Sequence, residues 1–347
     1  MDKFSLKQVL MRVISVKELN VSESDIINIQ EQHGGLVNYI FRIETKKGLF
    51  FLKQFLEKFK AIEESEIEFD ALKNIETRSK DRLSISYEAE NQFEKILGRE
   101  NHIVPHIYFY NGKEGYLIIE GFEKISSLLE KIKTATFPKQ SILSLAKSIA
   151  KIHQETFIEN NENFDLYNNK WLDLKLKYTF YEMVKLLDKK IAKTLQDFAD
   201  NYKKQRFVLT HGDLCSINIF LNDKEEAKIH LIDFEDAHIG APSFDLGYLL
   251  SEYFVAGENF PKKKKEIHQN IREFLDTYFF TFNKQDRNIV EIETTMHTAN
   301  MMLFRTFGLS KDTFTKYLNN NVVRSSVKDY AVNMIKDSNR PISYFVS

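Results

Sequence analysis

One polar segment in the second half of the chain, HGDLCSINIF at residues 211–220, is entered from one apolar run and left through another. Short apolar runs on either side of a polar stretch are typical of two strands joined by a loop. The loop carries Asp213 and Asn218, five positions apart, and a third apolar run further along the chain ends at Asp233. This pattern predicts three oxygen-bearing side chains at neighbouring strand ends.

The residue types at these positions suit phosphoryl transfer. A carboxylate such as Asp213 accepts the proton of a hydroxyl that attacks a phosphate. An amide oxygen and a second carboxylate, here Asn218 and Asp233, are ligands that Mg²⁺ prefers. The order of an Asp, four residues, an Asn and then an Asp on the next hairpin matches the kinase arrangement of base and metal ligands. We predict Asp213 as the catalytic base and Asn218 and Asp233 as metal ligands.

Together with the segment APSFDL, which contains Asp245, these motifs resemble the aminoglycoside phosphotransferase and choline kinase family of small-molecule kinases. The resemblance implies an α+β, two-lobed protein-kinase-like fold, with a small N-lobe antiparallel sheet carrying one helix and a larger, mainly helical C-lobe. It implies ATP and Mg²⁺ as cofactors and a small-molecule hydroxyl as the acceptor. We expect His211 to brace the loop, Gly212 to serve backbone geometry and Asp245 to support the loop from below. An N-cap is the alternative for Asp245.

Protein kinases differ from this chain in both motifs. The chain has His-Gly-Asp where a protein kinase has His-Arg-Asp, and Asp-Phe-Glu at 233–235 where a protein kinase has Asp-Phe-Gly. An Ala-Pro-Glu ending is also missing. The sequence therefore favours a small-molecule kinase, with a protein kinase-like enzyme and a non-catalytic nucleotide-binding scaffold as alternatives.

Alternating apolar residues between positions 25 and 55 predict three strands joined by two turns. The resemblance assigns Gly34 and Gly35 to a hairpin that covers the nucleotide phosphates, because backbone N–H groups can approach an anion there. An ordinary turn is the alternative. A second hairpin is predicted around Asn111 and Gly112, between two further apolar runs.

Lys53 follows an apolar strand, where the family has the lysine that holds the α and β phosphates. The alternative is a surface lysine. A helix is predicted over residues 61–78, and its inward face carries Glu68, which we expect to pair with Lys53. Glu64 is the alternative partner.

The resemblance places the adenine-binding hinge at Glu120, Gly121 and Phe122. We therefore expect an N-lobe at residues 1–122, which binds nucleotide, and a C-lobe at 123–347, which holds the catalytic loop and the acceptor-binding helices.

Helical spacing of apolar residues predicts most of the remaining chain to be helical. One helix ends at His153, which we expect to be buried and hydrogen-bonded. Residues 79–101 are polar and partly helical, with no assigned role, and the tail at 312–347 is predicted as a helix with a loosely tied end. The other helices are predicted within 171–200, 246–254, 263–282 and 290–307.

The acceptor pocket is expected to be lined by polar residues of the C-lobe. Clustered carboxylates would suit a cationic acceptor. The segment 304–309 resembles methylthioribose kinase, a sugar kinase, with one arginine where that family has two. A sugar or an amino alcohol is therefore the preferred acceptor, and an aminoglycoside is an alternative. The candidate residues are Glu235, Asp236, His238, Glu252, His297 and Arg305.

Composition narrows the classes of partner. A net charge of −1 gives no electrostatic reason to expect nucleic acid or an anionic membrane. No apolar run reaches the length of a membrane span, and polar residues interrupt the N-terminal apolar stretch, so no signal peptide is expected. One cysteine, Cys215, excludes an intrachain disulfide and fits a reducing compartment. We expect a cytoplasmic protein in which Cys215 packs, with a reactive thiol as the alternative; the oligomeric state stays open.

Overall fold

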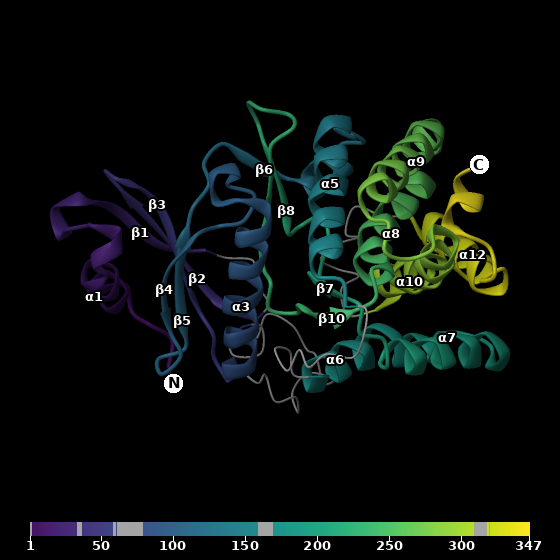
Figure 1. The fold of residues 1–347 in the computed structure, drawn as a ribbon, viewed down its shortest axis with the longest axis horizontal. Coiled ribbons are helices and arrows are strands. Elements are labelled where there is room, and N and C mark those ends of the chain that lie inside the picture. Colours follow the sequence, from purple (N-terminus) through teal and green to yellow (C-terminus); the bar gives the residue numbers. More distant parts are fainter. Residues whose placement is uncertain are drawn as a thin grey trace. The chain divides into compact units, whose positions relative to one another are not determined.

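The computed structural model describes residues 2–32, 37–57, 60, 79–158, 169–308, 318 and 320–347. The chain divides into two compact units, Met1–Glu123 and Lys124–Ser347, and Figure 1 shows the elements of each.

The first unit is built on a five-stranded sheet in the order β1-β2-β3-β5-β4. Every neighbouring pair is antiparallel, which confirms both predicted hairpins. Gly115, with φ of +69°, lies in the turn of the second hairpin, a backbone conformation that favours glycine. The strands are β1 (Ile26–Gln32), β2 (Tyr39–Thr45), β3 (Gly48–Gln54), β4 (Ile107–Asn111) and β5 (Tyr116–Glu120).

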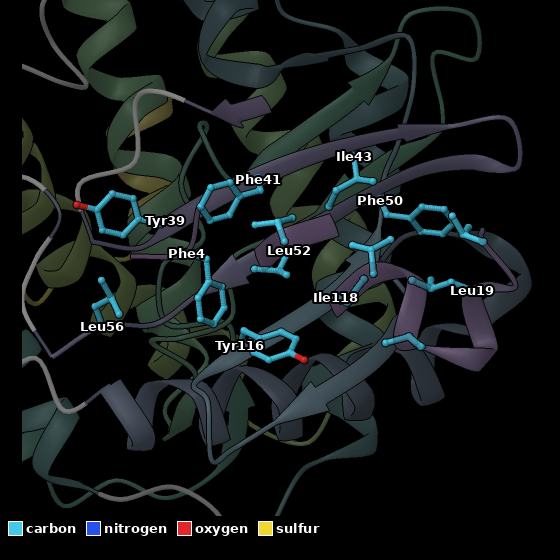
Figure 2. Packing of buried hydrophobic residues seen from close by; sticks show 14 residues of the cluster. Phe4, Leu19, Tyr39, Phe41, Ile43, Phe50, Leu52, Leu56, Tyr116 and Ile118 are labelled. Carbon is cyan, nitrogen blue, oxygen red and sulfur yellow. The ribbon is translucent and has the colours of Figure 1, made fainter. Parts of the chain in front are cut away.

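One face of this sheet packs against α1 (Leu6–Ser15) and the chain that flanks it. Burial along β2 alternates strictly, so every second side chain enters this core. Figure 2 shows Phe41, Leu52 and Tyr116 in the same cluster as Phe4. Helix α1 begins with a capping box between Ser5 and Gln8.

The other face packs a second cluster of Phe55, Leu83, Ile107 and Leu117. Leu83 belongs to α3 (Ser79–Leu97), which contacts β4 and β5. Residues 79–101, which sequence reasoning left without a role, thus form this covering helix and a short 3₁₀ turn, Arg99–Asn101. Helix α3 is polar on average, and for this reason sequence reasoning did not recognise that one side of it is buried.

The second unit is mainly helical, and its predicted helices are confirmed. Helix α8 contacts α9, α10 and α12, and α5 contacts α9 (Figure 1). The helices are α4 (Leu128–Lys133), α5 (Lys139–Glu155), α6 (Asn169–Leu176), α7 (Lys189–Tyr202), α8 (Ser243–Asn259), α9 (Lys264–Thr281), α10 (Arg287–Phe307) and α12 (Asn321–Lys336).

Two small antiparallel sheets carry the loops of the site. The first has the order β6-β8-β9 and the second pairs β7 with β10. Strands β7 and β8, which flank residues 211–218, therefore belong to different sheets. Their bounds are β6 (Ile125–Ser127), β7 (Val208–Thr210), β8 (Ile219–Asn222), β9 (Ile229–Leu231) and β10 (His238–Gly240).

The prediction of a loosely tied C-terminal end is wrong. The last turn, Ile342–Val346, buries Ile342 and Val346 completely. The backbone N–H of Ser343 donates to Glu291 Oε2 at 3.1 Å. Apolar residues scattered in a polar tail were enough to anchor it. Among the described residues, no helix is long and apolar enough to cross a membrane.

Candidate active site

The loop between β7 and β8 turns sharply at Gly212, whose φ is +78°. A Cβ atom at this position would lie 1.9 Å from the backbone oxygen of Asp236. Both the conformation and the close approach therefore require glycine. The turn directs the chain into Asp213, whose side chain is 24% exposed.

Helix α8 holds the start of this loop through Asp245. Its carboxylate accepts hydrogen bonds from the backbone N–H groups of His211, at 2.7 Å, and Gly212, at 3.0 Å. His153 Nε2 lies 3.3 Å from the same carboxylate, and His153 Nδ1 is 2.7 Å from the hydroxyl of Tyr278. The prediction of a buried, hydrogen-bonded His153 is confirmed. The N-cap alternative for Asp245 is wrong, because the residue lies inside the helix and its oxygens bind the loop.

Burial raises the pKa of Asp245, but the hydrogen bond and charge of His153 and the backbone hydrogen bond from His211 outweigh this effect, so the net pKa falls below its ordinary value. The carboxylate therefore stays ionised. An ionised acceptor makes stronger hydrogen bonds to backbone N–H groups than a neutral one.

Glu252, two turns further along α8, holds the middle of the loop. It accepts a hydrogen bond from the backbone N–H of Ser216 at 3.0 Å and lies 3.6 Å from Arg305 Nε. Residues seven apart lie on the same side of a helix, so Asp245 and Glu252 support the loop from one face. Glu252 was predicted to line the acceptor pocket, and the structure places its carboxylate under the loop instead.

His211 connects the loop to the end of β9. Its Nδ1 accepts from the backbone N–H of Asp213 at 3.3 Å, and its Nε2 donates to the carbonyl oxygen of Ile232 at 3.1 Å. Burial lowers the pKa of His211 below its ordinary value, so the ring is neutral, with one donor and one acceptor.

Asn218 and Asp233 lie at the adjacent ends of β8 and β9. The Asn218 Nδ2 group donates to the backbone oxygen of Asp213 at 3.0 Å and to its Oδ2 at 2.9 Å. The side-chain oxygen of Asn218 is therefore turned away from Asp213. The backbone N–H of Ile232 donates to Asn218 O at 3.1 Å, which ties the residue before Asp233 to Asn218.

Asp233 has φ of +70°, in the left-handed region that few non-glycine residues adopt. Such conformations are concentrated at functional sites. An amide oxygen and a carboxylate at neighbouring strand ends are the donor set of a hard divalent cation, so these residues fit Mg²⁺.

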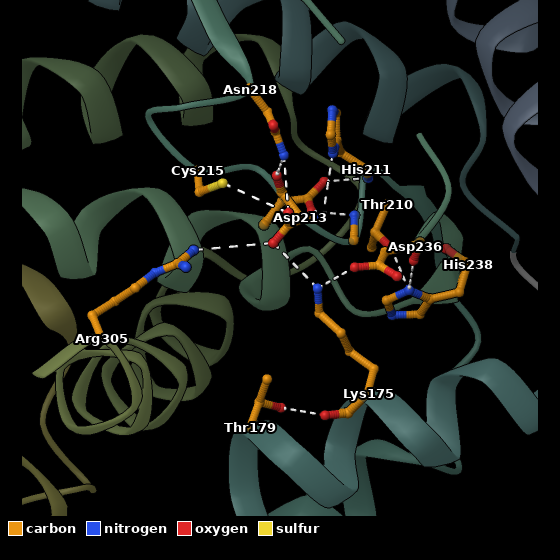
Figure 3. Close-up of polar contacts among 12 residues, drawn as sticks. Lys175, Thr179, Thr210, His211, Asp213, Cys215, Asn218, Asp236, His238 and Arg305 are labelled. Atoms are coloured by element: carbon orange, nitrogen blue, oxygen red, sulfur yellow. Dashed lines mark hydrogen bonds and ion pairs between the residues drawn. The ribbon is translucent and has the colours of Figure 1, made fainter. Parts of the chain in front are cut away.

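Two cations lie beside Asp213, as Figure 3 shows. Lys175 Nζ is 3.2 Å from Asp213 Oδ1 and also binds Asp236 Oδ2. Arg305 Nη2 approaches Asp213 Oδ1 from the other side, at 4.0 Å. The Asp213 carboxylate is thus at the centre of a network of charged side chains.

These charges decide the protonation states. Burial raises the pKa of Asp213, but the positive charges of Lys175 and Arg305 lower it by more. The net pKa therefore lies below its ordinary value. Burial also raises the pKa of Asp236, and Lys175 offsets this only in part. Burial lowers the pKa of Lys175, yet Asp213 and Asp236 together raise it well above its ordinary value. Asp213 is therefore a carboxylate and Lys175 an ammonium ion at neutral pH.

Sequence reasoning did not find Lys175. It lies on α6, just before a π-helical segment, Lys177–Tyr181, and π-helical turns are frequent at functional sites. The hydroxyl of Thr179 donates to Lys175 O at 2.8 Å, and Asn300 Nδ2 of α10 donates to Thr179 O at 2.8 Å. No motif marked this lysine among the 49 lysines and arginines of the chain.

The other predicted acceptor residues occupy different environments. Glu235 is buried beside Asp236 in the turn after Asp233. His238 Nε2 accepts from the hydroxyl of Tyr202 at 2.6 Å, and its Nδ1 donates to Asp236 O at 2.9 Å. Burial lowers the pKa of His238 to about 4, so its ring is neutral and engaged inside the unit.

His297 is fully buried among aromatic rings, away from the charged network. Cys215 is fully buried, with Sγ 3.7 Å from Asp213 Oδ2. Burial raises the pKa of its thiol well above the ordinary value, which favours the packing interpretation over a reactive thiol.

In the first unit, Lys53 is buried and its Nζ lies 5.0 Å from the ring centre of Phe55. The preceding residue, Leu52, points to the sheet face that packs against α1. Lys53 therefore points to the opposite face, which α3 covers, as does its register partner Leu117. That helix carries a buried carboxylate, Glu90. The predicted residues Gly34, Gly35, Glu64 and Glu68 lie outside the described residues.

The hinge candidates end the first unit. Glu120 is the last residue of β5, and its carboxylate contacts His102 Nδ1 at 2.9 Å and accepts from the backbone N–H of His106 at 3.2 Å. The N–H of Gly121 donates to Leu49 O at 2.8 Å. Phe122 follows, half-buried. Adenine recognition by these residues stays a prediction.

Comparison with solved structures defines the class of fold. A choline/ethanolamine kinase family protein from Mesorhizobium loti superposes with a TM-score of 0.54 at 13% identity, covering 98% of this chain and 96% of that one. An amicoumacin kinase superposes with a TM-score of 0.51 at 14% identity, covering 98% and 95%. The predicted α+β, two-lobed kinase-like fold is confirmed.

Sequence comparison defines the family. The pattern of the phosphotransferase enzyme family matches residues 29–263, and the chain belongs to this family. The members of this family are phosphotransferase enzymes. A probable ethanolamine kinase from Arabidopsis thaliana is 35% identical over 92 residues, which span 25% of this chain and 22% of that protein.

Proposed function

We propose that the protein transfers the γ-phosphoryl group of ATP, with Mg²⁺, to a hydroxyl group of a small molecule. Membership of the phosphotransferase enzyme family supports the reaction class. The amicoumacin kinase of the same fold was solved with AMP-PNP and Ca²⁺, which supports a nucleoside triphosphate and a divalent cation. A sugar or an amino alcohol is the proposed acceptor class.

Asp213 is the proposed catalytic base. Its carboxylate is ionised and partly exposed, so a hydroxyl can reach it and transfer a proton to it. Asn218 and Asp233 would hold Mg²⁺, and the ion would supply positive charge to neutralise the phosphate oxygens. Lys53 of the first unit is proposed to bind the α and β phosphates.

The observation that supports this function most strongly is the fixed position of Asp213. Buried carboxylates of α8, Asp245 and Glu252, bind the loop on both sides of it, and His211 ties it to the end of β9. Asn218 binds the Asp213 carboxylate directly. Such preorganisation is what a positioned proton acceptor requires, because small displacements of a catalytic group cost much of the rate.

The test is ADP release with a panel of sugars, amino alcohols and aminoglycosides, for the wild type and for Asp213→Asn. The variant should lose about 10² to 10⁴ in kcat with little change in KM for ATP. Asp197→Asn, the same change on the exposed surface of α7, is the matched control and should retain full activity. Full acceptor-dependent turnover by Asp213→Asn would refute the assignment of the base.

The metal assignment has its own test. Asp233→Asn should abolish the Mg²⁺ dependence of ATP binding measured by titration calorimetry, because a charged ligand is lost. Unchanged titration would contradict this role. A cytoplasmic location is proposed on the evidence of the lone cysteine, which is buried as a thiol.

A further inference from the structure

Two fixed cations of the second unit surround the proposed base. Lys175 Nζ binds Asp213 and Asp236 together, and Arg305 lies between Asp213, at 4.0 Å, and Glu252, at 3.6 Å. Asp213, Asp236 and Glu252 are thus each paired with a cation of the chain. A further ammonium ion beside Asp213 would meet repulsion from both cations as well as attraction.

The aromatic ring of Tyr248 is occupied by the same two cations. Lys175 Nζ lies 5.0 Å from the ring centre of Tyr248, and Arg305 Cζ lies 5.4 Å from it. A protein recognises an ammonium group with carboxylates, with aromatic faces or with both. Lys175 and Arg305, which both lie close to Asp213, already contact a carboxylate and an aromatic face.

Lys175 is held in this position by its helix. Leu172 and Leu176, on the same helix, are buried. The backbone after Lys175 is tied to α10 through Thr179 and Asn300. Moving the ammonium away would separate it from two partly buried carboxylates, Asp213 and Asp236, and breaking a partly buried ion pair is costly.

We infer that Lys175 and Arg305 exclude positively charged acceptors, and that the acceptor is an uncharged hydroxyl compound such as a sugar or a polyol. This inference rests on the proposed function, because it takes Asp213 as the group that the acceptor hydroxyl contacts. It selects the sugar over the amino alcohol. The protein would thus differ in acceptor charge from relatives described as choline or ethanolamine kinases.

The experiment uses pairs of acceptors that differ in charge and little in shape. Choline is compared with 3,3-dimethylbutan-1-ol, ethanolamine with ethylene glycol, and glucosamine, with its amine protonated, with glucose. Phosphorylation is measured as kcat/KM for each member. The wild type should favour the uncharged member of each pair by about tenfold or more.

The variants test whether Lys175 is the cause. Lys175→Gln should reduce the preference for the uncharged member by about tenfold, because Asp213 and Asp236 then attract an ammonium ion. Lys175→Arg keeps the charge and should keep the preference. Lys177→Gln, the same change at an exposed position two residues on, is the matched control and should behave as the wild type.

The outcomes separate the two proposals. A wild type that favours the cationic members, or a Lys175→Gln variant that folds, turns over and keeps the wild-type preference, would overturn the inference and leave the kinase function intact. Absence of transfer to every acceptor of either charge would count against the proposed function itself, and the inference would fall with it.

Discussion

Replacing His297 with leucine should change how the stability of the protein depends on pH. His297 is fully buried, and in the described part of the chain neither of its ring nitrogens has a hydrogen-bond partner. Its ring lies 4.8 to 5.5 Å, centre to centre, from four aromatic rings that surround it: Phe180, Phe198, Tyr202 and Phe244. Among the described residues, a charged imidazolium would have no hydrogen-bond partner at this position.

The magnitude follows from the pKa. Burial lowers the pKa of His297 from 6.5 to about 3, and neighbouring His238 contributes in the same direction. Below pH 6.5, His297 is therefore protonated in the unfolded chain, whereas in the folded chain it stays neutral down to about pH 3. Stability is fully present above this window and is lost as the pH falls through it, at about 1.4 kcal/mol per pH unit. At pH 5, His297 alone should cost about 2 kcal/mol relative to pH 7.

Leucine cannot titrate and leaves no buried nitrogen without a partner. We expect His297→Leu to be about as stable as the wild type at pH 7, because loss of the unpaired polar group offsets imperfect packing. At pH 5 it should lose about 2 kcal/mol less than the wild type. Urea unfolding at the two pH values measures both differences.

Phe198→Leu is the matched control. It changes a neighbouring ring of the same cluster to leucine and adds or removes no titrating group. Its cost should be equal at pH 5 and pH 7. If His297→Leu shows the same loss between pH 7 and pH 5 as the wild type, the buried neutral histidine is not the source of the acid sensitivity.

Three further predictions concern the catalytic loop. Gly212→Ala should abolish turnover, because its Cβ would overlap Asp236 O; an active variant in the ADP-release assay would contradict the described turn. Asp245→Asn should lower both kcat and the urea midpoint, with a loss of about 3 kcal/mol, because the N–H groups of His211 and Gly212 lose a charged acceptor; unchanged values would show that the brace is dispensable. Cys215 should resist iodoacetamide in the native protein and react in urea, as followed by mass spectrometry; rapid native labelling would disprove its burial.

The strands on either side of residues 211–218 could be predicted from the sequence because their signals are local. Apolar runs define strand ends within a few residues, and the spacing between Asp213 and Asn218 is read directly along the chain. The hairpins of the first unit were predictable for the same reason. The strict alternation in β2 reflects the geometry of a strand with one face in a core.

Buried polar residues were harder to place. His238, His297 and Glu252 were all expected to line the acceptor pocket. In the structure His238 pairs with Tyr202, and His297 lies in an aromatic cluster. Glu252 binds the backbone of the loop at Ser216. A buried polar side chain and a site residue have the same sequence pattern. Only the tertiary packing around each residue separates them.

The amino-acid sequence by itself determined the motif that carries Asp213, Asn218 and Asp233, because short spacings are properties of the chain alone, and its resemblance to a kinase family implied the class of fold. Tertiary structure decided which charges meet that motif. Lys175 is 38 positions before Asp213 and reaches it only because α6 packs beside the loop. Contacts between distant segments depend on how helices pack, and no local pattern encodes them.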